Sequence, residues 1–336
     1  MKKVKIAQIG TSGYSHGISI WRSLLRQTDI FEVAGYALPE NERQKFPDQM
    51  KAFDGHREMS VEEILNDPEI EAVAVETEEI YLTKYALMAA KAGKHLHMEK
   101  PGGIELADFR ELIDILKSKG LTFTTGYMYR FNPKVKEALE KIEKGELGEI
   151  YAVEAHMSCK HGEGNRRWFS NFPGGMMFFL GCHLIDLIYR IQGEPIEVIP
   201  LNCSTGIDGI NTDDYGMVVY KYKNGISFAK TCDNEVGGAM RRQLVICGEK
   251  GTIEISPLEV WKNDGIYVCS RECYEKSNKG WYDDWDLSQS GPYDRYDDMM
   301  RNFAKIIRGN ENPYSYDYEL GLYELILKSC GVGELL

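Results

Sequence analysis

Hydrophobic residues in the first third of the chain lie in short runs, separated by amphipathic stretches with helical spacing. The runs predict strands and the stretches predict helices, so the two kinds of element alternate. Such alternation is typical of a parallel sheet covered by helices on both faces. The predicted strands are 4–10, 31–37, 71–76, 95–98 and 121–126, with helices that end near Arg26, Ala92 and Lys119.

Two local signals predict where helices begin. Ser60 is followed three residues later by Glu63, which is the pattern of a capping box. Asn132-Pro133 combines a favoured N-cap residue with proline in the first turn, and predicts a helix that runs to about Lys144.

The pattern of hydrophobic and polar residues changes after Gly148, where strand-like runs dominate. Asn224-Gly225 and Glu249-Lys250-Gly251 separate adjacent runs, as hairpin turns do. We therefore expect a largely antiparallel sheet with one apolar helix, 176–191, and two amphipathic helices, 294–308 and 317–330. The predicted strands are 149–157, 196–204, 213–222, 225–233, 242–248 and 251–256.

These patterns predict an α/β protein with two domains. The first, 1–126, is a Rossmann-type doubly wound parallel sheet that binds a nucleotide, and the second, 127–336, is an α/β domain with a large open, mainly antiparallel sheet. A length of 336 residues agrees with two cores rather than one.

Charge and composition exclude several classes of protein. The formal net charge of −12, without a local basic patch, argues against a nucleic-acid partner. No run of 18 apolar residues occurs, and the apolar stretch after Met1-Lys2-Lys3 is too short and too polar for a signal peptide, so we expect no membrane partner. The eight cysteines are expected to be free thiols in a reducing compartment, which predicts a cytoplasmic location.

A glycine-rich turn follows the first predicted strand, in the sequence Gly10-Thr11-Ser12-Gly13-Tyr14-Ser15. Such a turn lets backbone N–H groups approach a pyrophosphate at a helix N-terminus. In the usual G-x-G-x-x-G spacing only Gly10 fits, because Ser12 and Ser15 stand at the second and third positions and Gly13 is out of register. A turn that needs glycine without any ligand is the alternative interpretation.

The residue that would distinguish NAD from NADP is not evident. The second predicted strand ends Tyr36-Ala37-Leu38-Pro39, without the acidic residue that binds a ribose 2′-hydroxyl. Glu40 or Asn41 could substitute, and no arginine lies directly at the strand end to argue for a 2′-phosphate, although Arg43 is near. The prediction is therefore NAD or NADP.

Lys100 follows the fourth predicted strand and precedes Pro101. The carboxyl ends of parallel strands face the crevice where ligands bind, so the Lys100 ammonium group could stabilise alkoxide character on a substrate. A solvated loop lysine is the alternative interpretation.

Five segments form one pattern along the chain: Ala92-Gly93-Lys94-His95 with Glu99-Lys100-Pro101, the stretch 126–133, the stretch 145–150, Gly174-Gly175 with Gly181-x-His183-x-x-Asp186, and the stretch 248–253. Taken together and in order, they resemble the glucose–fructose oxidoreductase / inositol dehydrogenase (Gfo/Idh/MocA) family. The resemblance covers nearly the whole chain.

The resemblance implies a nicotinamide cofactor and the oxidation or reduction of a hydroxyl carbon on a sugar, cyclitol or related polyol. It places the catalytic lysine on Lys100 and the catalytic histidine on His183, the general base. Asp186 lies three residues on, on the same helix face, and could orient the imidazole. The predicted cofactor-binding residues are Gly10, Thr11, Ser12, Gly13, Tyr14, Ser15, Leu38, Thr77, Glu99 and Lys100; the predicted substrate-binding residues are Tyr129, Arg130, Trp168 and His183, with Arg166 or Arg167 as further candidates.

The chain departs from the family pattern at four places. Phe179 stands where the family commonly has an aspartate, four residues before the histidine. Thr77 is followed by Glu78 rather than proline, the glycine loop is altered, and the strand-end acid is missing. These departures keep two alternatives open: a redox-neutral, NAD-dependent enzyme that cleaves or eliminates a glycoside with tightly bound cofactor, and a non-catalytic binding protein.

Two further expectations concern metal and assembly. His156, Cys159 and His161 resemble a metal-binding set, but on one strand His156 faces away from the other two, so no metal is expected. The open sheet of the second domain, by resemblance, pairs with another copy to give a homodimer or homotetramer.

Overall fold

The computed structural model describes residues 2–277 and 284–332. The chain divides into two compact units, one of Met1–Met128 with Tyr296–Tyr323, the other of Tyr129–Arg295 with Glu324–Leu336. The prediction that all of 127–336 forms one domain differs from this division, because a C-terminal segment returns to the first unit.

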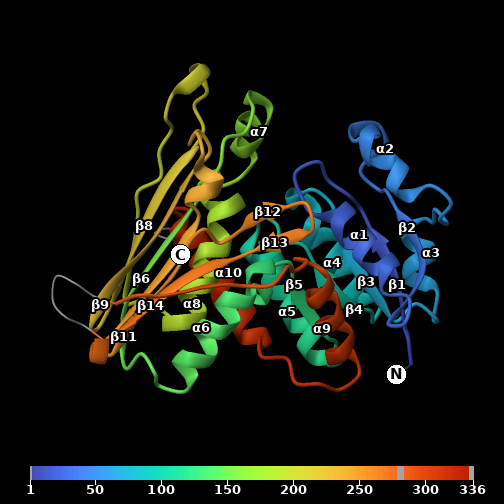
Figure 1. The fold of residues 1–336 in the computed structure, drawn as a ribbon. Helices are drawn as coiled ribbons and strands as arrows, with labels where there is room; N and C mark the ends of the chain where they lie inside the picture. Colours follow the sequence, from blue (N-terminus) through green and yellow to red (C-terminus); the bar gives the residue numbers. More distant parts are fainter. Residues whose placement is uncertain (1, 278–283, 333–336) are drawn as a thin grey trace. The chain divides into compact units, whose positions relative to one another are not determined.

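The first unit is built on a parallel sheet of five strands, as the sequence predicts, and their order is β2-β1-β3-β4-β5 (Figure 1). The chain passes from β1 to one side of the sheet and returns to its other side with β3, so the order reverses there. Open α/β sheets bind ligands at the carboxyl ends of the strands at such a reversal. The strands are β1 Val4–Ile9, β2 Phe31–Ala37, β3 Ala72–Val75, β4 His95–Met98 and β5 Phe123–Thr125.

Helices connect these strands, and their ends follow local chemistry. Ser60 accepts a hydrogen bond from the Glu63 N–H while the Glu63 side chain accepts from the Ser60 N–H, so the predicted capping box is confirmed. α1 buries Ile20, Trp21 and Leu24 on one face. The helices are α1 Gly17–Arg26, α2 Glu42–Lys45, α3 Val61–Asn66, α4 Leu82–Lys91 and α5 Leu106–Lys119, with the 3-10 turns η1 Pro47–Phe53 and η2 Glu79–Tyr81.

The helix α9 (Asp297–Ile307) and the first half of α10 (Tyr316–Ser329) belong to this first unit. Asp297 accepts a hydrogen bond of 2.7 Å from Ser23 Oγ on α1. Tyr323 stacks on Phe109 of α5 with ring centroids 4.3 Å apart. Contacts between residues so distant in sequence leave no local pattern. The sequence analysis therefore did not predict that Tyr296–Tyr323 packs in the first unit.

The second unit is built on an eight-stranded sheet in the order β15-β14-β11-β10-β6-β9-β8-β7. All neighbours are antiparallel except β6 and β9, so the prediction of a mainly antiparallel sheet is confirmed. The strands are β6 Ile150–Ser158, β7 Glu197–Pro200, β8 Tyr215–Tyr222, β9 Gly225–Cys232, β10 Gln243–Gly248, β11 Gly251–Ile255, β14 Cys269–Tyr274 and β15 Asp286–Gln289, with a separate hairpin of β12 Val260–Lys262 and β13 Gly265–Tyr267.

Among the helices of the second unit, one N-cap agrees with the sequence prediction and one helix start differs from it. The Asn132 side chain accepts hydrogen bonds from the N–H groups of Lys134 and Val135, as predicted. The apolar helix predicted over 176–191 begins instead with a π-helical turn, Met177–Gly181, before α8, which packs against β6 and β9. The helices are α6 Pro133–Glu143, α7 Glu163–Trp168 and α8 Cys182–Gln192.

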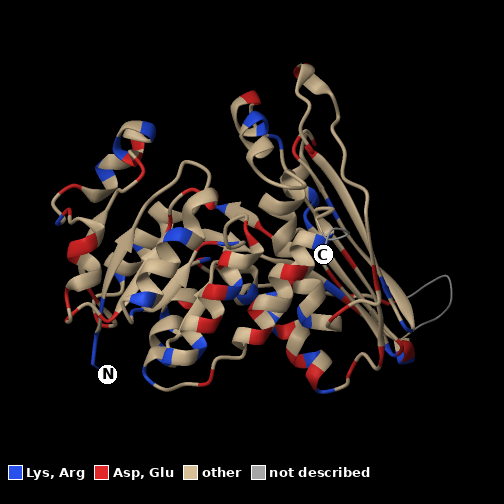
Figure 2. Cartoon of the chain, turned by 180° about the vertical axis from the view of Figure 1, so that it is seen from behind, with Lys and Arg blue, Asp and Glu red and all other residues tan. Residues whose placement is uncertain are grey.

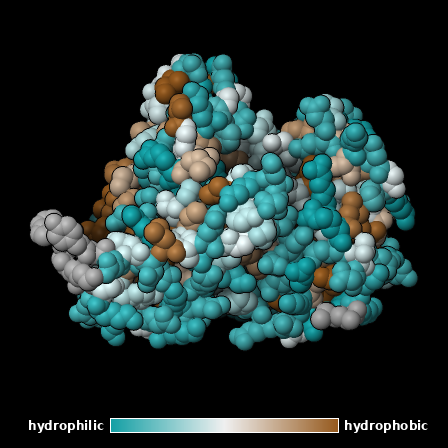
Figure 3. Space-filling model, viewed as in Figure 1, coloured by the Kyte–Doolittle hydropathy of each residue, from teal (hydrophilic) through white to brown (hydrophobic). Residues whose placement is uncertain are grey.

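The surface mixes charges of both signs, and Figure 2 shows Lys and Arg interspersed with Asp and Glu in both units. Hydrophobic surface also appears, and in Figure 3 part of it lies along the left edge of the view, where the large sheet lies. Within the described residues, no helix combines the length and apolarity needed to cross a bilayer. The eight cysteines are free thiols.

Candidate active site

The predicted glycine loop lies at the reversal point of the first sheet. Gly10 follows β1 with a φ of +87°, a conformation that glycine adopts without strain. A Cβ on Gly10 would lie 2.3 Å from Thr77 Cγ2, on the segment that follows β3. The structure thus brings together Gly10 and Thr77, two predicted cofactor-binding residues, in a packing that only glycine permits.

The close approach of helix and strand is provided by Gly17, a residue that the sequence analysis missed. A Cβ on Gly17 would lie 3.1 Å from Glu76 Cβ and 3.2 Å from Thr11 Oγ1. Ser15 instead accepts a hydrogen bond from the Gly17 N–H at 3.4 Å. The signal was present as a glycine at the first residue of the helix. The Gly10 turn and the start of α1 have the strand-turn-helix arrangement of a pyrophosphate site, and Gly17 lets the helix pack closely on Thr11 and Glu76.

An unpredicted carboxyl group covers the loop. Glu42, in α2, is buried and accepts a hydrogen bond of 3.3 Å from the Thr11 N–H. Burial raises the pKa of Glu42 to about 8, although the hydrogen bond from Thr11 acts in the opposite sense. The Gln49 side chain donates to the Ser12 carbonyl at 2.9 Å. Near neutral pH the Glu42 carboxyl group is therefore largely uncharged, and it accepts a hydrogen bond from the N–H of Thr11, in the loop proposed to bind a phosphate.

Nucleotide affinity is expected to fall as pH rises through about 8, because Glu42 then becomes an anion beside the phosphates. Two unit charges about 10 Å apart at an effective dielectric constant of about 20 repel by about 1.7 kcal/mol, or somewhat more than tenfold in affinity. Fluorescence titration of NADH at about pH 6.5 and about pH 9 measures the loss. Glu42→Gln should reduce the pH dependence, whereas the exposed Glu62→Gln should leave it intact; equal slopes in both variants would refute this role for Glu42.

The residues weighed for ribose recognition are already engaged within the first unit. Glu40 accepts hydrogen bonds from Lys84 Nζ at 2.7 Å and from the Tyr85 hydroxyl at 2.6 Å. Partial burial opposes ionisation of Glu40, but these hydrogen bonds outweigh it and lower its pKa. Arg43 forms an ion pair with Glu58. The structure therefore leaves the choice between NAD and NADP as open as the sequence does.

Lys100 lies at the carboxyl end of β4 and is 2% exposed. Its Nζ lies 4.0 Å from Glu99 Oε1, and its backbone N–H donates to the same oxygen at 3.1 Å. Burial raises the pKa of Glu99, and Lys100 together with a hydrogen bond from the His16 backbone N–H partly offsets that rise. His16 immediately precedes α1. Glu99 thus links the segment that carries Lys100 to the end of the glycine loop.

Two more glutamates of this region are buried, which the sequence analysis did not foresee. Glu76 and Glu79 are both 0% exposed, and among the described residues their carboxyl oxygens have no hydrogen-bond partner. Burial raises the pKa of Glu79 to about 8 and raises that of Glu76 well above its usual range. Glu79 is therefore largely protonated near neutral pH, so this part of the first unit carries less negative charge than its composition suggests.

In the second unit, Asp186 forms a buried ion pair with Arg130. Arg130 donates from Nε to both carboxylate oxygens, at 3.1 and 3.0 Å, and from Nη2 to Oδ1 at 2.7 Å. The two side chains are 4% and 1% exposed. The geometry supports a structural role for this pair, while the roles of Arg130 in substrate binding and of Asp186 in orienting His183 stay predictions.

Breaking this pair is expected to destabilise the fold. Asp186→Asn would leave the Arg130 guanidinium buried without its counter-charge, a change that costs about 3–5 kcal/mol in buried pairs. Urea unfolding followed by tryptophan fluorescence measures the loss. The exposed Asp264→Asn is the matched control and should change the unfolding free energy by less than about 0.5 kcal/mol. Equal stability of the two variants would contradict the assignment.

His183 lies on α8, is 1% exposed, and packs its ring edge-on against Tyr129, with centroids 5.2 Å apart and planes at 78°. The Tyr129 hydroxyl donates to Glu259 Oε2 at 3.0 Å and accepts from Arg242 Nη1 at 3.2 Å. Burial raises the pKa of Tyr129 to about 12. The Tyr129 ring is therefore held beside His183 by two hydrogen bonds, and its hydroxyl group stays uncharged near neutral pH.

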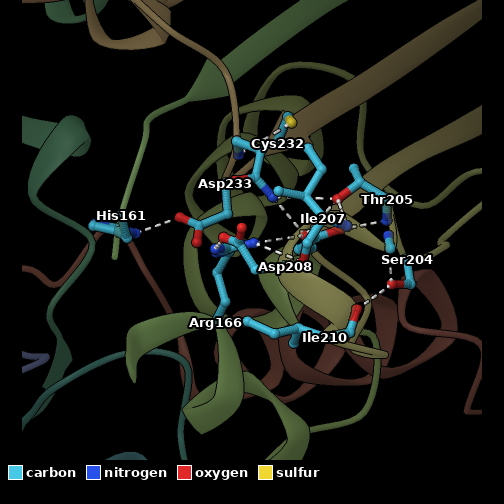
Figure 4. Close-up of polar contacts among 12 residues, drawn as sticks. His161, Arg166, Ser204, Thr205, Ile207, Asp208, Ile210, Cys232 and Asp233 are labelled. Atoms are coloured by element: carbon cyan, nitrogen blue, oxygen red, sulfur yellow. Dashed lines mark hydrogen bonds and ion pairs between the residues drawn. The ribbon is translucent and has the colours of Figure 1, made fainter. Parts of the chain in front are cut away.

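Trp168 and Phe179 form an aromatic cluster. Their rings meet edge to face, with centroids 5.3 Å apart and planes at 90°, and both side chains are buried. Arg166 is buried as well and forms an ion pair with Asp208 (Figure 4). An apolar ring thus occupies the position of the aspartate that the family pattern would place at 179.

Comparison with known proteins identifies the chain's relatives. Residues 4–127 match the oxidoreductase family with an NAD-binding Rossmann fold, and residues 135–254 match the GFO/IDH/MocA C-terminal domain. The uncharacterized oxidoreductase YhhX of Escherichia coli is 36% identical over 147 residues, which cover 43% of this chain and 41% of that protein. The trans-1,2-dihydrobenzene-1,2-diol dehydrogenase of Bos taurus is 26% identical over 200 residues, 58% of each chain.

These two alignments span between two fifths and three fifths of the relatives' own length. The fold extends further: the aldose-aldose oxidoreductase of Caulobacter crescentus superimposes with a TM-score of 0.77 at 20% identity, covering 98% of both chains.

The fold and the family model together define the first unit as a Rossmann domain of the NAD-binding class. The chain belongs to the GFO/IDH/MocA oxidoreductase family, as the resemblance in its sequence predicts.

Proposed function

We propose that this protein transfers a hydride between NAD or NADP and a hydroxyl carbon of a sugar, cyclitol or related polyol. The observation that carries the proposal is Lys100, a buried lysine at the carboxyl end of β4, beside the strand that precedes Thr77. A relative is named a dehydrogenase of a vicinal diol, which supports a substrate with neighbouring hydroxyl groups.

In this proposal each predicted site residue has a role in binding the cofactor or in the reaction. Gly10 to Ser15 and Thr77 would hold the pyrophosphate of the cofactor, and Leu38, Glu99 and Lys100 would bind other parts of the nucleotide. The bound nicotinamide supplies hydride acceptance or donation. Lys100 donates a hydrogen bond to the substrate oxygen, which lowers the cost of alkoxide character there.

His183 takes the hydroxyl proton in the oxidation direction and returns it in reduction, a step typically worth about 10²–10⁴ in rate. Asp186 acts indirectly, because the hydrogen bonds that it accepts from Arg130 hold α8 against the segment that carries Tyr129. It is therefore a positioning residue in this proposal.

A panel of sugars, cyclitols and linear polyols, each supplied with NAD and with NADP, tests the proposal. We expect one substrate class to produce reduced nicotinamide, followed by absorbance, and Lys100→Met to abolish the signal. Glycoside cleavage without net nicotinamide reduction, dependent on a tightly bound cofactor, would replace the dehydrogenase with the redox-neutral enzyme. Nucleotide binding without turnover of any substrate would favour the binding protein.

We further propose that the large sheet pairs with a second copy of the chain, giving a dimer or tetramer. Ile199, Ile226 and Leu287 lie on three strands of that sheet and are 39%, 60% and 82% exposed. Exposed apolar side chains along a sheet indicate a surface that another chain covers. Light scattering should give a multiple of the 38.3 kDa chain mass, whereas a mass of one chain would refute the assembly.

A further inference from the structure

Three potential metal ligands meet at the ends of two parallel strands of the second unit. Cys159 and His161 follow β6, and Asp233 follows β9, whose last residues are paired in register. Backbone hydrogen bonds fix the two segments to each other: the Cys159 N–H donates to the Cys232 carbonyl at 3.0 Å and the His161 N–H to the Asp233 carbonyl at 3.2 Å. The three side chains are therefore held by a rigid backbone frame.

The Cys159 sulfur is spaced from the other two donor atoms as two ligands of one small cation would be. Cys159 Sγ lies 3.4 Å from His161 Nδ1 and 3.4 Å from Asp233 Oδ1. His161 Nδ1 is also in direct contact with Asp233 Oδ1, and Figure 4 shows the ring directed at that carboxylate. Zinc bonds of about 2.3 Å to sulfur and about 2.0–2.2 Å to nitrogen or oxygen, at tetrahedral angles, place such atoms about 3.3–3.6 Å apart.

Asp233 gives an independent indication of a ligand. Its side chain is 0% exposed, and its Oδ2 atom has no hydrogen-bond partner among residues 2–277 and 284–332. A buried carboxylate oxygen without a partner is costly, and a bound cation would satisfy it. Arg242 also approaches Cys159, but its charge is shared with Glu259, 3.6 Å away.

A nucleophilic cysteine would be the alternative use of a thiol, an imidazole and a carboxylate. In such a triad the nucleophile and the carboxylate contact opposite nitrogens of the ring. Here Sγ lies nearest Nδ1, at 3.4 Å, and Asp233 contacts that same nitrogen. Burial and the nearby Asp233 raise the pKa of the Cys159 thiol to about 12, so the free thiol is a poor nucleophile.

We propose that Cys159, His161 and Asp233 bind one divalent cation of the zinc class. A thiolate and a carboxylate neutralise its two charges, and the mixed sulfur, nitrogen and oxygen donors favour Zn²⁺ or Co²⁺ over Mg²⁺ or Ca²⁺. Three protein ligands leave the fourth position to water. The His161 side chain is 32% exposed, which gives the ion a route from solvent.

The sequence analysis expected no metal because His156 faces away from Cys159 and His161. His156 is indeed engaged elsewhere, with Ser158 Oγ at 2.8 Å and Glu235 at 3.2 Å. Asp233, more than seventy residues further on, completes the set instead. No local spacing rule could have found it.

Titration of the chelator-treated full chain with Co²⁺ tests the site. We expect thiolate-to-cobalt charge-transfer absorption that saturates at one equivalent and is abolished by added Zn²⁺ but not by Mg²⁺. Cys159→Ser should lose the charge-transfer band, and Asp233→Asn should weaken Co²⁺ binding by at least about tenfold. His161→Gln, at the partly exposed ligand, should weaken it similarly if the other variants fold poorly.

Cys203→Ser is the matched control, because Cys203 is an exposed thiol of the same unit. It should retain the full Co²⁺ spectrum. A spectrum that survives in Cys159→Ser, one that disappears in Cys203→Ser, or the absence of saturable absorption in the unmodified protein would each overturn the proposal.

Discussion

Lys100→Met should lower kcat by about 10²–10⁴ while nucleotide binding changes little, because the ammonium group acts on charge that develops during the reaction. The side chain is 2% exposed, so its hydrogen bonds are not shared with bulk water. Steady-state rates on the best substrate of the polyol panel, with nucleotide affinity measured separately, distinguish kcat from binding.

Lys94→Met is the matched control, because Lys94 is another buried lysine of the same unit. Its Nζ donates to the carbonyl oxygens of Asp67 and Ile70, at 2.6 and 2.9 Å. Losing these hydrogen bonds should cost stability, about 1–3 kcal/mol, but should leave kcat per folded molecule unchanged. A Lys100→Met enzyme as active as Lys94→Met would remove Lys100 from the mechanism.

Gly10→Ala should weaken nucleotide binding by about a hundredfold or more. A Cβ there would lie 2.3 Å from Thr77 Cγ2 and 2.7 Å from the Thr77 backbone nitrogen, so the loop and the segment after β3 would have to separate. Those two segments are the proposed pyrophosphate site. Fluorescence titration with NADH and NADPH measures the change.

Gly93→Ala separates the steric effect from backbone strain. Gly93 has a φ of +77°, similar to the +87° of Gly10, but a Cβ at Gly93 would meet no atom within 4 Å. Both variants carry the left-handed strain, about 1–2 kcal/mol, and only Gly10→Ala carries the clash. Gly93→Ala should bind nucleotide normally; equal losses in the two variants would mean that strain, not the loop, governs binding.

Local chemistry made much of the fold predictable. The second strand was placed at its observed bounds, Phe31–Ala37, because its apolar run is bounded by turn residues. The Ser60 capping box and the Asn132 cap were found because each depends on residues within one helical turn. The family resemblance joined the weak local motifs at the glycine loop and Lys100 into a specific pattern, and the roles it gives these residues stay predictions.

Long-range features escaped prediction for physical reasons. β15 is an edge strand whose four residues are all exposed, so it lacks the apolar alternation by which strands are recognised. The buried Glu42, Glu76 and Glu79 were not foreseen, because glutamate in a sequence suggests solvent. The partnership of Asp233 with Cys159 depends on the parallel pairing of β6 with β9, which no segment of sequence encodes alone.

The central proposal is that this chain is an oxidoreductase whose Rossmann domain binds a nicotinamide nucleotide at the altered glycine loop. Titration of the purified chain with NADH and with NADPH tests it most directly. Following nicotinamide fluorescence, we predict saturable binding of at least one nucleotide at one site per chain, stronger at about pH 6.5 than at about pH 9, where Glu42 is ionised. Failure of both nucleotides to bind at either pH would contradict the claim, and the non-catalytic interpretation would then replace it.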